Sequence, residues 1–413
     1  MSDWKEYSLG NLVELVIDYR GKTPLKLGGN WSFYGYRALS AKNIKTGQIV
    51  NEESIRFVDE DLYRKWMKDE VQRGDILITS EAPFGQILFW DSDEKIVLSQ
   101  RLFCLRISSR ACPRFVYYYM TTHTFQHELD GRATGTTVIG LRQPELLKCR
   151  IKLPTYKEQV HIANILKSFD DKIECNRRIN ENLEQQAQAL FKSWFVDFEP
   201  FKDQPFVESE LGMIPQGWRV ECLNEFGKIV CGKTPSKAES SYYGGNIPFV
   251  KIPDMHNNIF VLHSEDCLSD LGDKSQVGKR IPPYSVLVSC IATVGLVGMN
   301  VRTCHTNQQI NTIIPNSIEY RYYLYQKLVS LREYLINLGR GGTATLNVNT
   351  RQFGNIRIVR PSDKVLSEYH QRISCLFDKI EINSLESRRL AELRDTLLPK
   401  LMSGELKVGE INV

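Results

Sequence analysis

The sequence predicts an α+β protein: two repeat-related, mixed α/β globular domains separated by two long antiparallel helices that form a coiled coil. The first observation is an internal repeat, because Gly21-Lys22-Thr23-Pro24 returns 211 residues later at 232–235. In the same way 171–174, Asp-Lys-Ile-Glu, returns 207 residues later at 378–381. A repeat of about half the chain is too long for a solenoid or a propeller blade and indicates a duplicated domain. The second observation is a heptad pattern of apolar residues after each globular segment.

The repeat divides the chain into four segments. The first globular domain is expected over residues 1–153 and the second over 206–360. Each contains short apolar runs bounded by turn residues, such as Ile76-Leu77-Ile78 after Arg73-Gly74-Asp75, which is typical of strands. We expect the long helices over 154–205 and over 361–413, the latter including a C-terminal tail.

The first long helix has a clear start and a regular apolar seam. Thr155 and Glu158 have the spacing of a capping box, and from there no Gly or Pro appears until Pro200. A helix of about 40 residues would be about 60 Å long. The seam in the first helix is Ile162, Leu166, Phe169, Ile173, Asn176, Asn180, Leu183, Ala187, Leu190 and Trp194, and in the second it is Tyr369, Ile373, Leu376, Ile380, Asn383, Ser387, Leu390, Arg394, Leu397 and Leu401.

One apolar stripe on a long helix must be covered, and the simplest cover is the repeat-related helix. The seam is interrupted at equivalent places by Asn176 and Asn383. These residues either fix the register of the pair by buried hydrogen bonds or are partly exposed seam positions, and the pattern leaves both alternatives open.

The composition is that of an ordinary globular protein, with 413 residues, 42% apolar and 25% charged. No run of 18 apolar residues exists and the N-terminus lacks the pattern of a signal peptide, so we expect a cytoplasmic protein without a membrane segment. The ten cysteines form no Cys-x-x-Cys pair, which argues against a zinc site or a disulfide framework. The net charge of +4 is compatible with nucleic-acid binding but does not indicate it alone.

Two motifs resemble catalytic sequences, and we reject both. Residues 227–234 satisfy the phosphate-loop pattern, but Pro235 does not open the required helix and the first half has Val16 in place of Gly227. Pro282-Pro283-Tyr284 resembles the core of amino-methyltransferase sites, yet Ile281 stands where such chemistry needs a polar residue. With no other catalytic or metal-ligating cluster, we expect a protein that is not an enzyme and holds no cofactor or metal.

Glycine-rich polar loops recur at equivalent places in the two halves. The loop 131–137 is followed by Leu141-Arg142-Gln143, and the loop 339–345 is followed by 349–352, Asn-Thr-Arg-Gln. Glycine lets backbone amides approach phosphates, and Thr and Arg add donors. The residues 99–101 align with 307–309, and their Arg, Asn and Gln side chains are types that read base edges. The pattern favours DNA binding over solvated turns.

The chain resembles, over essentially its full length, the specificity subunits of type I restriction–modification systems. The resemblance is carried by Leu153-Pro154, Glu158-Gln159, Ile162-Ala163, the Asp-Asp-Lys-Ile run at 170–173, and the Phe-Lys-Ser-Trp-Phe-Val-Asp-Phe run at 191–198. The second half departs from it, since it has Leu398-Pro399-Lys400-Leu401-Met402 in place of the aromatic run and lacks the capping box.

The resemblance implies that each domain is a target recognition domain reading one half of a bipartite, asymmetric double-stranded DNA site. It also implies helices that set the spacing and dock two methyltransferase subunits, and it leaves open whether a restriction subunit joins. Alternatives are a scaffold that binds protein and an enzyme dependent on a nucleotide or S-adenosylmethionine. The expected DNA contacts are Lys22, Thr23, Lys42, Asn43, Gln100, Arg101, Arg132, Thr136, Thr137 and Arg142 in the first domain, and Lys233, Thr234, Lys251, Asn307, Gln308, Arg340, Thr343, Thr345 and Arg351 in the second.

Overall fold

The computed structural model describes residues 4–135, 139–340 and 345–407. The chain divides into two compact units, one of residues 1–173 with 389–413 and one of residues 174–388. Each unit therefore contains one globular domain, the nearer part of the helix that follows it, and the far part of the other long helix. No helix in the described ranges is both long and apolar enough to cross a membrane.

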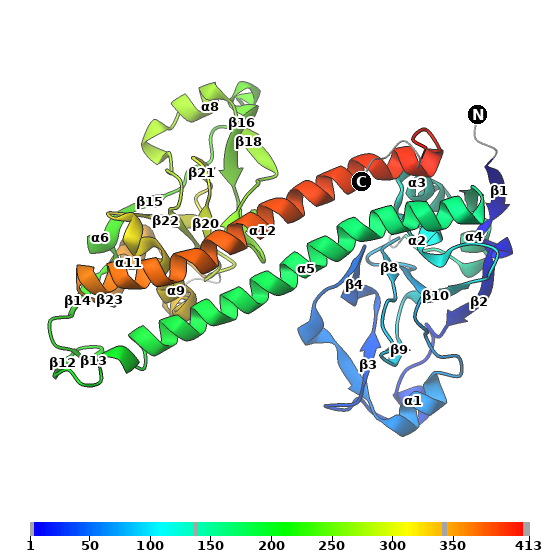
Figure 1. The fold of residues 1–413 in the computed structure, drawn as a ribbon, viewed down its shortest axis with the longest axis horizontal. Coiled ribbons are helices and arrows are strands. Elements are labelled where there is room, and N and C mark those ends of the chain that lie inside the picture. The colour runs from blue at the N-terminus through cyan, green and yellow to red at the C-terminus, as the bar shows by residue number, and fades with distance from the viewer. Residues whose placement is uncertain (1–3, 136–138, 341–344, 408–413) are drawn as a thin grey trace. The chain divides into compact units, whose positions relative to one another are not determined.

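The first domain, blue to cyan in Figure 1, is built on a four-stranded sheet of order β2-β10-β7-β8. A separate three-stranded sheet has the order β6-β3-β9, and β1 pairs with β11, the strand that precedes the long helix. The strands are β1 Lys5–Ser8, β2 Val13–Asp18, β3 Tyr36–Leu39, β4 Ile44–Lys45, β5 Gln48–Ile49, β6 Arg56–Val58, β7 Ile76–Thr79, β8 Ile87–Phe89, β9 Ile96–Leu98, β10 Leu102–Ile107 and β11 Arg150–Leu153. The helices are α1 Glu60–Trp66, α2 Pro113–Thr121, α3 His123–Arg132 and α4 Gln143–Leu147.

The second domain has the same plan, with a five-stranded sheet of order β15-β22-β19-β20-β17 and a three-stranded sheet β18-β16-β21. The strands are β12 Phe206–Ser209, β13 Gly212–Pro215, β14 Arg219–Cys222, β15 Gly227–Cys231, β16 Tyr243–Val250, β17 Phe260–Val261, β18 Asp266–Leu268, β19 Val286–Ser289, β20 Val297–Asn300, β21 His305–Thr306, β22 Ile310–Pro315 and β23 Arg357–Arg360. The helices are α6 Leu223–Phe226, α7 Ile252–Met255, α8 Asp270–Lys274, α9 Arg321–Ser330, α10 Arg332–Gly339 and α11 Thr350–Gly354.

Strand registers confirm the duplication residue by residue. Leu102 of β10 lies opposite Thr79, and Ile310 of β22 lies opposite Ser289, so both partners have moved by about 210 positions. The parallel pairing of β3 with β9 recurs as that of β16 with β21. Because a slip of one residue would turn every side chain to the other face, matched registers mean matched buried faces.

Backbone conformations repeat as well. Ala82 and Ala292, 210 residues apart, both have positive φ, 41° and 63°; Ala82 lies between β7 and β8, and Ala292 lies between the equivalent strands β19 and β20. Gly74, with φ 97°, is matched by Tyr284, with φ 59°. The left-handed region disfavours non-glycine residues, so its use at equivalent positions is a property of the shared framework.

The two long helices are α5 Tyr156–Phe195 and α12 Asp363–Ser403. The predicted capping box is formed at the start of α5: Thr155 N donates to Glu158 Oε2 at 3.1 Å, and Glu158 N donates to Thr155 Oγ1 at 3.4 Å. At the start of α12, Ser362 Oγ accepts a hydrogen bond from Val365 N at 3.4 Å without a reciprocal acid.

The predicted seam is confirmed, because every seam residue of both helices is buried or half-buried. The pairing is antiparallel: Asn176 Nδ2 donates to Ser387 Oγ at 3.2 Å, and Asn180 Nδ2 donates to Ser384 Oγ at 3.1 Å. Asn176 and Asn383 are 0% and 1% exposed, which excludes the alternative that they are partly exposed positions. Asn383 Nδ2 donates to Asn180 Oδ1 at 2.9 Å, so the interruptions are buried interhelical hydrogen bonds.

Each domain packs on the beginning of one long helix and the end of the other. In the unit of 174–388, Phe191, Trp194 and Phe195 of α5 join Tyr369 of α12 in a core with the second domain. In the other unit, Ile162 and Leu166 of α5 share a core with Leu401 and Met402 of α12. The missing aromatic run of the second half is thus replaced by aliphatic side chains that meet a different domain.

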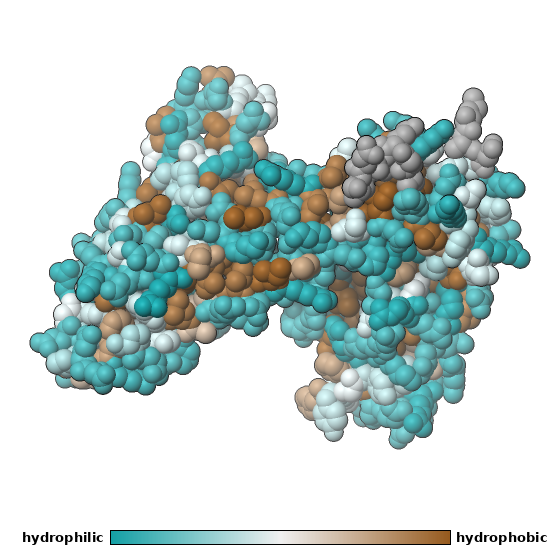
Figure 2. Space-filling model, in the orientation of Figure 1, coloured by the Kyte–Doolittle hydropathy of each residue, from teal (hydrophilic) through white to brown (hydrophobic). Residues whose placement is uncertain are grey.

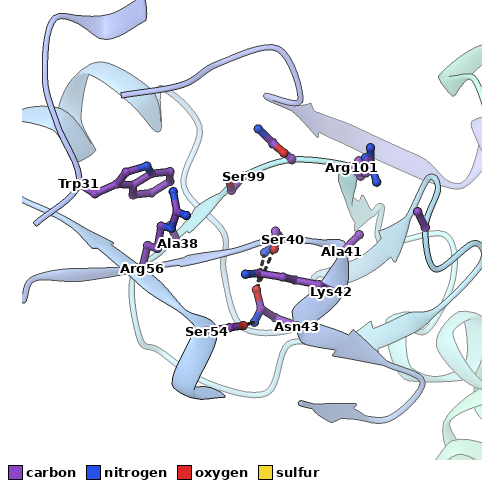
Figure 3. A pocket seen from close by; sticks show the side chains of 12 residues that line it. Trp31, Ala38, Ser40, Ala41, Lys42, Asn43, Ser54, Arg56, Ser99 and Arg101 are labelled. Carbon is purple, nitrogen blue, oxygen red and sulfur yellow. Dashed lines mark hydrogen bonds between the residues drawn. The ribbon is translucent and has the colours of Figure 1, made fainter. Parts of the chain in front are cut away.

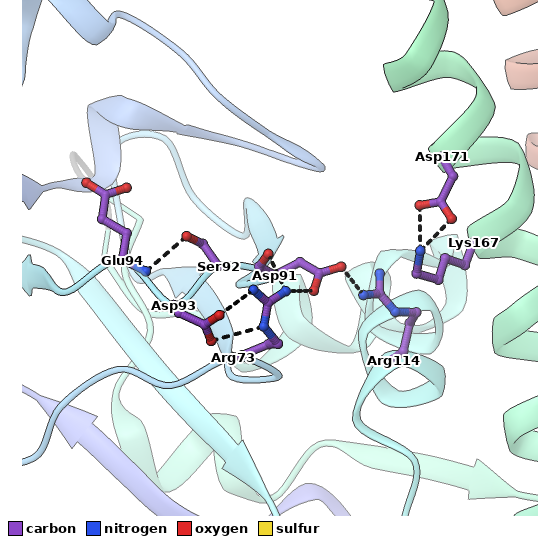
Figure 4. A network of polar contacts seen from close by, with 8 residues as sticks. All are labelled: Arg73, Asp91, Ser92, Asp93, Glu94, Arg114, Lys167 and Asp171. Carbon is purple, nitrogen blue, oxygen red and sulfur yellow. Dashed lines mark hydrogen bonds and ion pairs between the residues drawn. The ribbon is translucent and has the colours of Figure 1, made fainter.

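Ion pairs tie the edge of the first domain together, as Figure 4 shows. Arg73 contacts Asp91 and Asp93 at 2.7 Å each, and Arg114 of α2 contacts the other oxygen of Asp91 at 2.5 Å. Burial alone would raise the pKa of Asp91, but the two guanidinium groups lower it. The network joins α2 to the loop after β8, and both arginines already have carboxylate partners within the domain.

Candidate nucleic-acid interface

A hollow of about 390 Å³ opens on the first domain where β3, β6 and the start of β10 meet (Figure 3). It brings together Lys42 and Asn43 with Gln100 and Arg101, which are far apart in the sequence. Of its twelve described lining residues three are cationic and none is acidic: the cations are Lys42, Arg56 and Arg101, and the rest are Trp31, Ala38, Ser40, Ala41, Asn43, Ser54, Ala82, Ser99 and Gln100. An exposed cationic hollow lined by hydroxyl and amide groups suits a polyanion.

The framework holds the floor of this hollow by main-chain contacts. Ser99 N donates to Leu39 O at 2.7 Å, and Ala41 N donates to Gln100 O at 3.1 Å. Arg101 has φ 65°, and this left-handed residue turns the chain from the rim of the hollow into β10. Its guanidinium lies 3.4 Å from Glu81, with the Arg101 side chain 46% exposed. Such an exposed ion pair is weak, so the Arg101 guanidinium can exchange Glu81 for a phosphate or a base.

The stem of the first glycine-rich loop lies beside the same rim. Thr134 and Gly140 form an antiparallel bridge, and Leu141 N donates to Ser80 O at 3.0 Å. Ser80 N in turn donates to Arg101 O at 2.9 Å, so the loop, the β7–β8 turn and the hollow are connected. Arg142 is exposed immediately after this stem. Thr136 and Thr137 lie outside the described residues.

Two predicted contacts of the first domain, Asn43 and Lys22, bind other parts of the domain. Asn43 is 0% exposed; its Oδ1 accepts from Ser40 Oγ at 2.8 Å and its Nδ2 donates to Ser54 Oγ at 3.1 Å. Asn43 thus stabilises the wall of the hollow from inside the domain, and we no longer propose it as a base contact. Lys22 Nζ donates to Trp66 O, and burial lowers the pKa of its ammonium.

Arg132 lies in a different hollow from Lys42, lined by residues of β1, α3 and β11 and by Lys148. It contacts Glu128 at 2.9 Å and Glu145 at 3.7 Å. Thr23 is half-buried, and its Oγ1 accepts from Lys26 N at 3.3 Å. These two residues are therefore used locally, and the structure does not bring them to the hollow.

The second domain arranges its equivalents on the same frame with different side chains. Lys233 and Gln308 are exposed, and Thr234 Oγ1 donates to Gln308 Oε1 at 2.6 Å. Asn307 is 8% exposed and its amide is bonded to Gln309, so it supports the turn instead of facing outward. Lys251 is half-buried and ion-paired with Asp266.

The remaining predicted residues lie around the second glycine-rich loop. Arg340 is exposed at the end of α10, where its Nη1 donates to Asn337 Oδ1 at 3.0 Å. Arg351 is exposed on α11, and Thr345 is exposed after the loop. Val348 N donates to Cys290 O at 2.8 Å, which repeats the contact of Leu141 with Ser80. Thr343 lies outside the described residues.

The structure places the two catalytic look-alikes in framework positions. Residues 227–231 of the phosphate-loop pattern are strand β15, and a Cβ at Gly232 would lie 2.1 Å from Asn307 O. Such packing leaves no room to cradle a phosphate. Tyr284 of the Pro-Pro-Tyr motif forms the left-handed turn before β19. Within the described ranges no group of His, Cys, Asp and Glu side chains is arranged to hold a metal.

Sequence reasoning missed Trp31 and Arg56, which form one wall of the hollow in Figure 3. The Arg56 guanidinium lies 5.2 Å from the centroid of the Trp31 ring. Nothing in the local sequence connects the two, because they meet only through the pairing of Ser32 with Phe57. The available signal was a Trp among the turn residues Gly28, Gly29 and Gly35.

Comparison with known proteins agrees with this architecture. Residues 1–185 and 215–395 each match the family described as the type I restriction modification DNA specificity domain. The chain is 34% identical to the type I restriction enzyme HindI specificity subunit of Haemophilus influenzae, over 98% of this chain and 100% of that protein. It is 30% identical to the MjaIX specificity subunit of Methanocaldococcus jannaschii, over 92% of this chain and 85% of that protein.

A solved structure shares the fold. It is the S subunit of a type I restriction–modification system from M. genitalium, with a TM-score of 0.61 at 16% identity, covering 97% of this chain and 96% of that one. The duplicated recognition domains, the paired helices and the two family matches together place this chain in the family of type I restriction–modification specificity subunits.

Proposed function

We propose that this protein is the non-catalytic DNA-reading subunit of its complex, in which each globular domain recognises one half of a bipartite, asymmetric site. The cationic hollow of the first domain and the Lys233–Gln308 region of the second would contact DNA. Lys42 and Lys233 would bind phosphates, while Arg101, Gln100 and Gln308 would read base edges. Arg142, Arg340 and Arg351 would add backbone contacts beside the glycine-rich loops.

The observation that carries this proposal is the difference in side chains on a shared frame. The strand registers and left-handed turns repeat, whereas Gln100 and Arg101 correspond to Gln308 and Gln309. Two frames with different exposed side chains suit two different half-sites.

The paired helices support a role in setting the spacing. Each is a continuous helix of 40 or 41 residues, about 60 Å long. Buried hydrogen bonds and an apolar seam fix their register. We propose that the outward faces of α5 and α12 dock two methyltransferase subunits, which would supply the catalysis.

The test is a map of methylated bases in a host that carries the full chain and its modification subunits and has no other methylation. We expect one motif with two fixed blocks and an unconserved spacer. Arg101→Ala should relax only one block, and Gln308→Ala only the other.

A matched control is Arg110→Ala. Arg110 is also exposed and lies just beyond the far end of β10, and the six residues of that strand separate it from Arg101 by about 20 Å. Its loss should leave the motif unchanged. A single undivided motif, or a change in both blocks with either variant, would contradict the proposal. Binding of labelled ATP or S-adenosylmethionine to the chain alone would favour an enzyme, and association without DNA contact would favour a scaffold.

A further inference from the structure

The first domain carries an aromatic tip that nothing in the unit covers. In the loop Gly28–Gly35, Phe33 is 99% exposed and Tyr34 is 83% exposed. These are the most exposed large aromatic side chains among the described residues. Single exposed apolar residues are common, but two adjacent rings held fully in water indicate a contact surface.

The loop is anchored although its tip is free. Ser32 N donates to Phe57 O at 2.9 Å, and the rings of Trp31 and Trp66 lie 6.2 Å apart. Gly35 has φ 121°, and a Cβ there would lie 2.3 Å from Val58 O, so only glycine allows this close approach. A tip held from both sides loses little entropy when it binds a partner.

The same loop forms the wall of the cationic hollow. Trp31, two residues before Phe33, lines the hollow with Arg56. Carboxylates also occur near the loop, but they have partners: Asp59 Oδ1 accepts from Leu62 N at 2.8 Å, and Glu60 pairs with Arg64 at 2.7 Å. A polyanion seated in the hollow would therefore contact the loop that carries the aromatic tip.

The described residues of the second domain include no such tip at the equivalent place. The repeat aligns Phe33 and Tyr34 with Gly244 and Gly245. Gly244 has φ 81°, and a Cβ at Gly245 would lie 2.4 Å from Leu268 O, so the frame excludes side chains at this place. The aromatic pair is thus a feature of one domain only.

We propose that Phe33 and Tyr34 enter a groove of the DNA and pack on the bases of the half-site read by the first domain. This inference rests on the proposed function and deepens it, because it makes the two half-sites differ in mode of recognition. The first would be read partly by apolar contact with bases, and the second by polar groups alone. Apolar side chains inserted between or against bases unstack them and kink the duplex.

The experiment measures binding of the full chain, with its modification subunits, to three duplexes. One carries the mapped site, and the others carry one or the other half scrambled. Phe33→Ala/Tyr34→Ala should weaken binding to the intact site roughly ten-fold to a hundred-fold, the range expected when aromatic contacts with bases are lost. It should not weaken binding to the duplex whose first half-site is already scrambled.

Salt dependence separates an apolar contact from an electrostatic one. The slope of log affinity against log salt should stay unchanged in the aromatic variant, whereas Lys42→Ala should reduce it by about one. Ile318→Ala is the matched control, since Ile318 is 59% exposed and follows the far end of β22 in the second domain. It should leave both affinity and slope unchanged.

The inference is overturned if the aromatic variant binds all three duplexes like the wild type, or loses affinity equally on all of them. Failure of the unmodified chain to distinguish the intact site from scrambled DNA would instead defeat the proposed function. Because both rings are exposed, the thermal unfolding midpoint should not change. If the midpoint does change, the variant Phe33→Leu provides the test, because it keeps an apolar side chain at the tip and should retain most of the affinity. A loss of affinity in Phe33→Leu as large as in the double variant would also overturn the inference.

Discussion

The buried amide of Asn383 in the helix seam allows a sharp test of what holds the two long helices in register. In Asn383→Ala the hydrogen bond from Nδ2 to Asn180 Oδ1, 2.9 Å long, is lost, and a half-buried acceptor is left unpaired. Leaving such a group unpaired costs about 1–3 kcal/mol. Alanine is the better helix former by about 0.6 kcal/mol, which offsets part of the loss. We expect a net destabilisation of about 0.5–2.5 kcal/mol.

The assay is hydrogen exchange of peptides from α5 and α12, because the two units need not unfold together and hydrogen exchange reports on each of them separately. The expected change corresponds to exchange about 2- to 70-fold faster at the most protected amides of the seam. Peptides covering β7, in the other unit, should not change. Asn182→Ala is the matched control, since Asn182 lies on α5 two residues from Asn180 and is exposed.

A second variant tests the role of the seam amides by removing all of them together. Asn176→Leu/Asn180→Leu/Asn383→Leu replaces the polar interruption by a continuous apolar seam. Asn176 Oδ1 is buried without a partner, so its removal relieves a desolvated acceptor. Replacing a buried polar network by apolar residues is often neutral or stabilising. The proposed role of the buried amide is refuted if the seam amides of Asn383→Ala exchange as slowly as those of Asn182→Ala, or if the triple variant is less stable than Asn383→Ala.

Three further predictions concern DNA affinity, packing and pH. Arg101→Ala should lower cognate affinity by about 1–3 kcal/mol without affecting random DNA, and Glu81→Gln should raise it by freeing the guanidinium; equal loss on random DNA in a gel shift would mean a phosphate contact. Trp194→Ala should destabilise its unit by about 3–5 kcal/mol in urea unfolding, and a loss below 1 kcal/mol would contradict its burial. Burial and, to a smaller degree, Arg321 lower the pKa of His370 in the folded protein. The free energy of unfolding should therefore fall as the pH drops below about 6.5, the pKa of His in an unfolded chain, by at most about 1.4 kcal/mol per pH unit. Denaturation at a series of pH values should show that His370→Gln removes this pH dependence.

Much of the fold could be predicted because it produces regular patterns in the sequence. The repeat offsets drift by only a few residues, and the heptad seam names the buried positions of both helices, all of which are buried or half-buried in the structure. The start of α5 follows from Thr155 and Glu158 alone, because a capping box is a local interaction. The capping box and the seam depend on residues within one or two helical turns of each other, and the repeat is a likeness between two segments that can be read without knowing any contact.

The site was decided by tertiary structure. The type of residue suggested Asn43 as a base contact, but its side-chain amide forms hydrogen bonds with Ser40 and Ser54 inside the domain. Trp31 and Arg56 became part of the interface only through strand pairing between distant segments. A polar side chain has the same chemistry whether it braces a turn or faces solvent, and the choice depends on which partners the fold brings near. The sequence alone therefore determined the duplicated frame, and only the packing of that frame decided which of its polar groups are left free to bind.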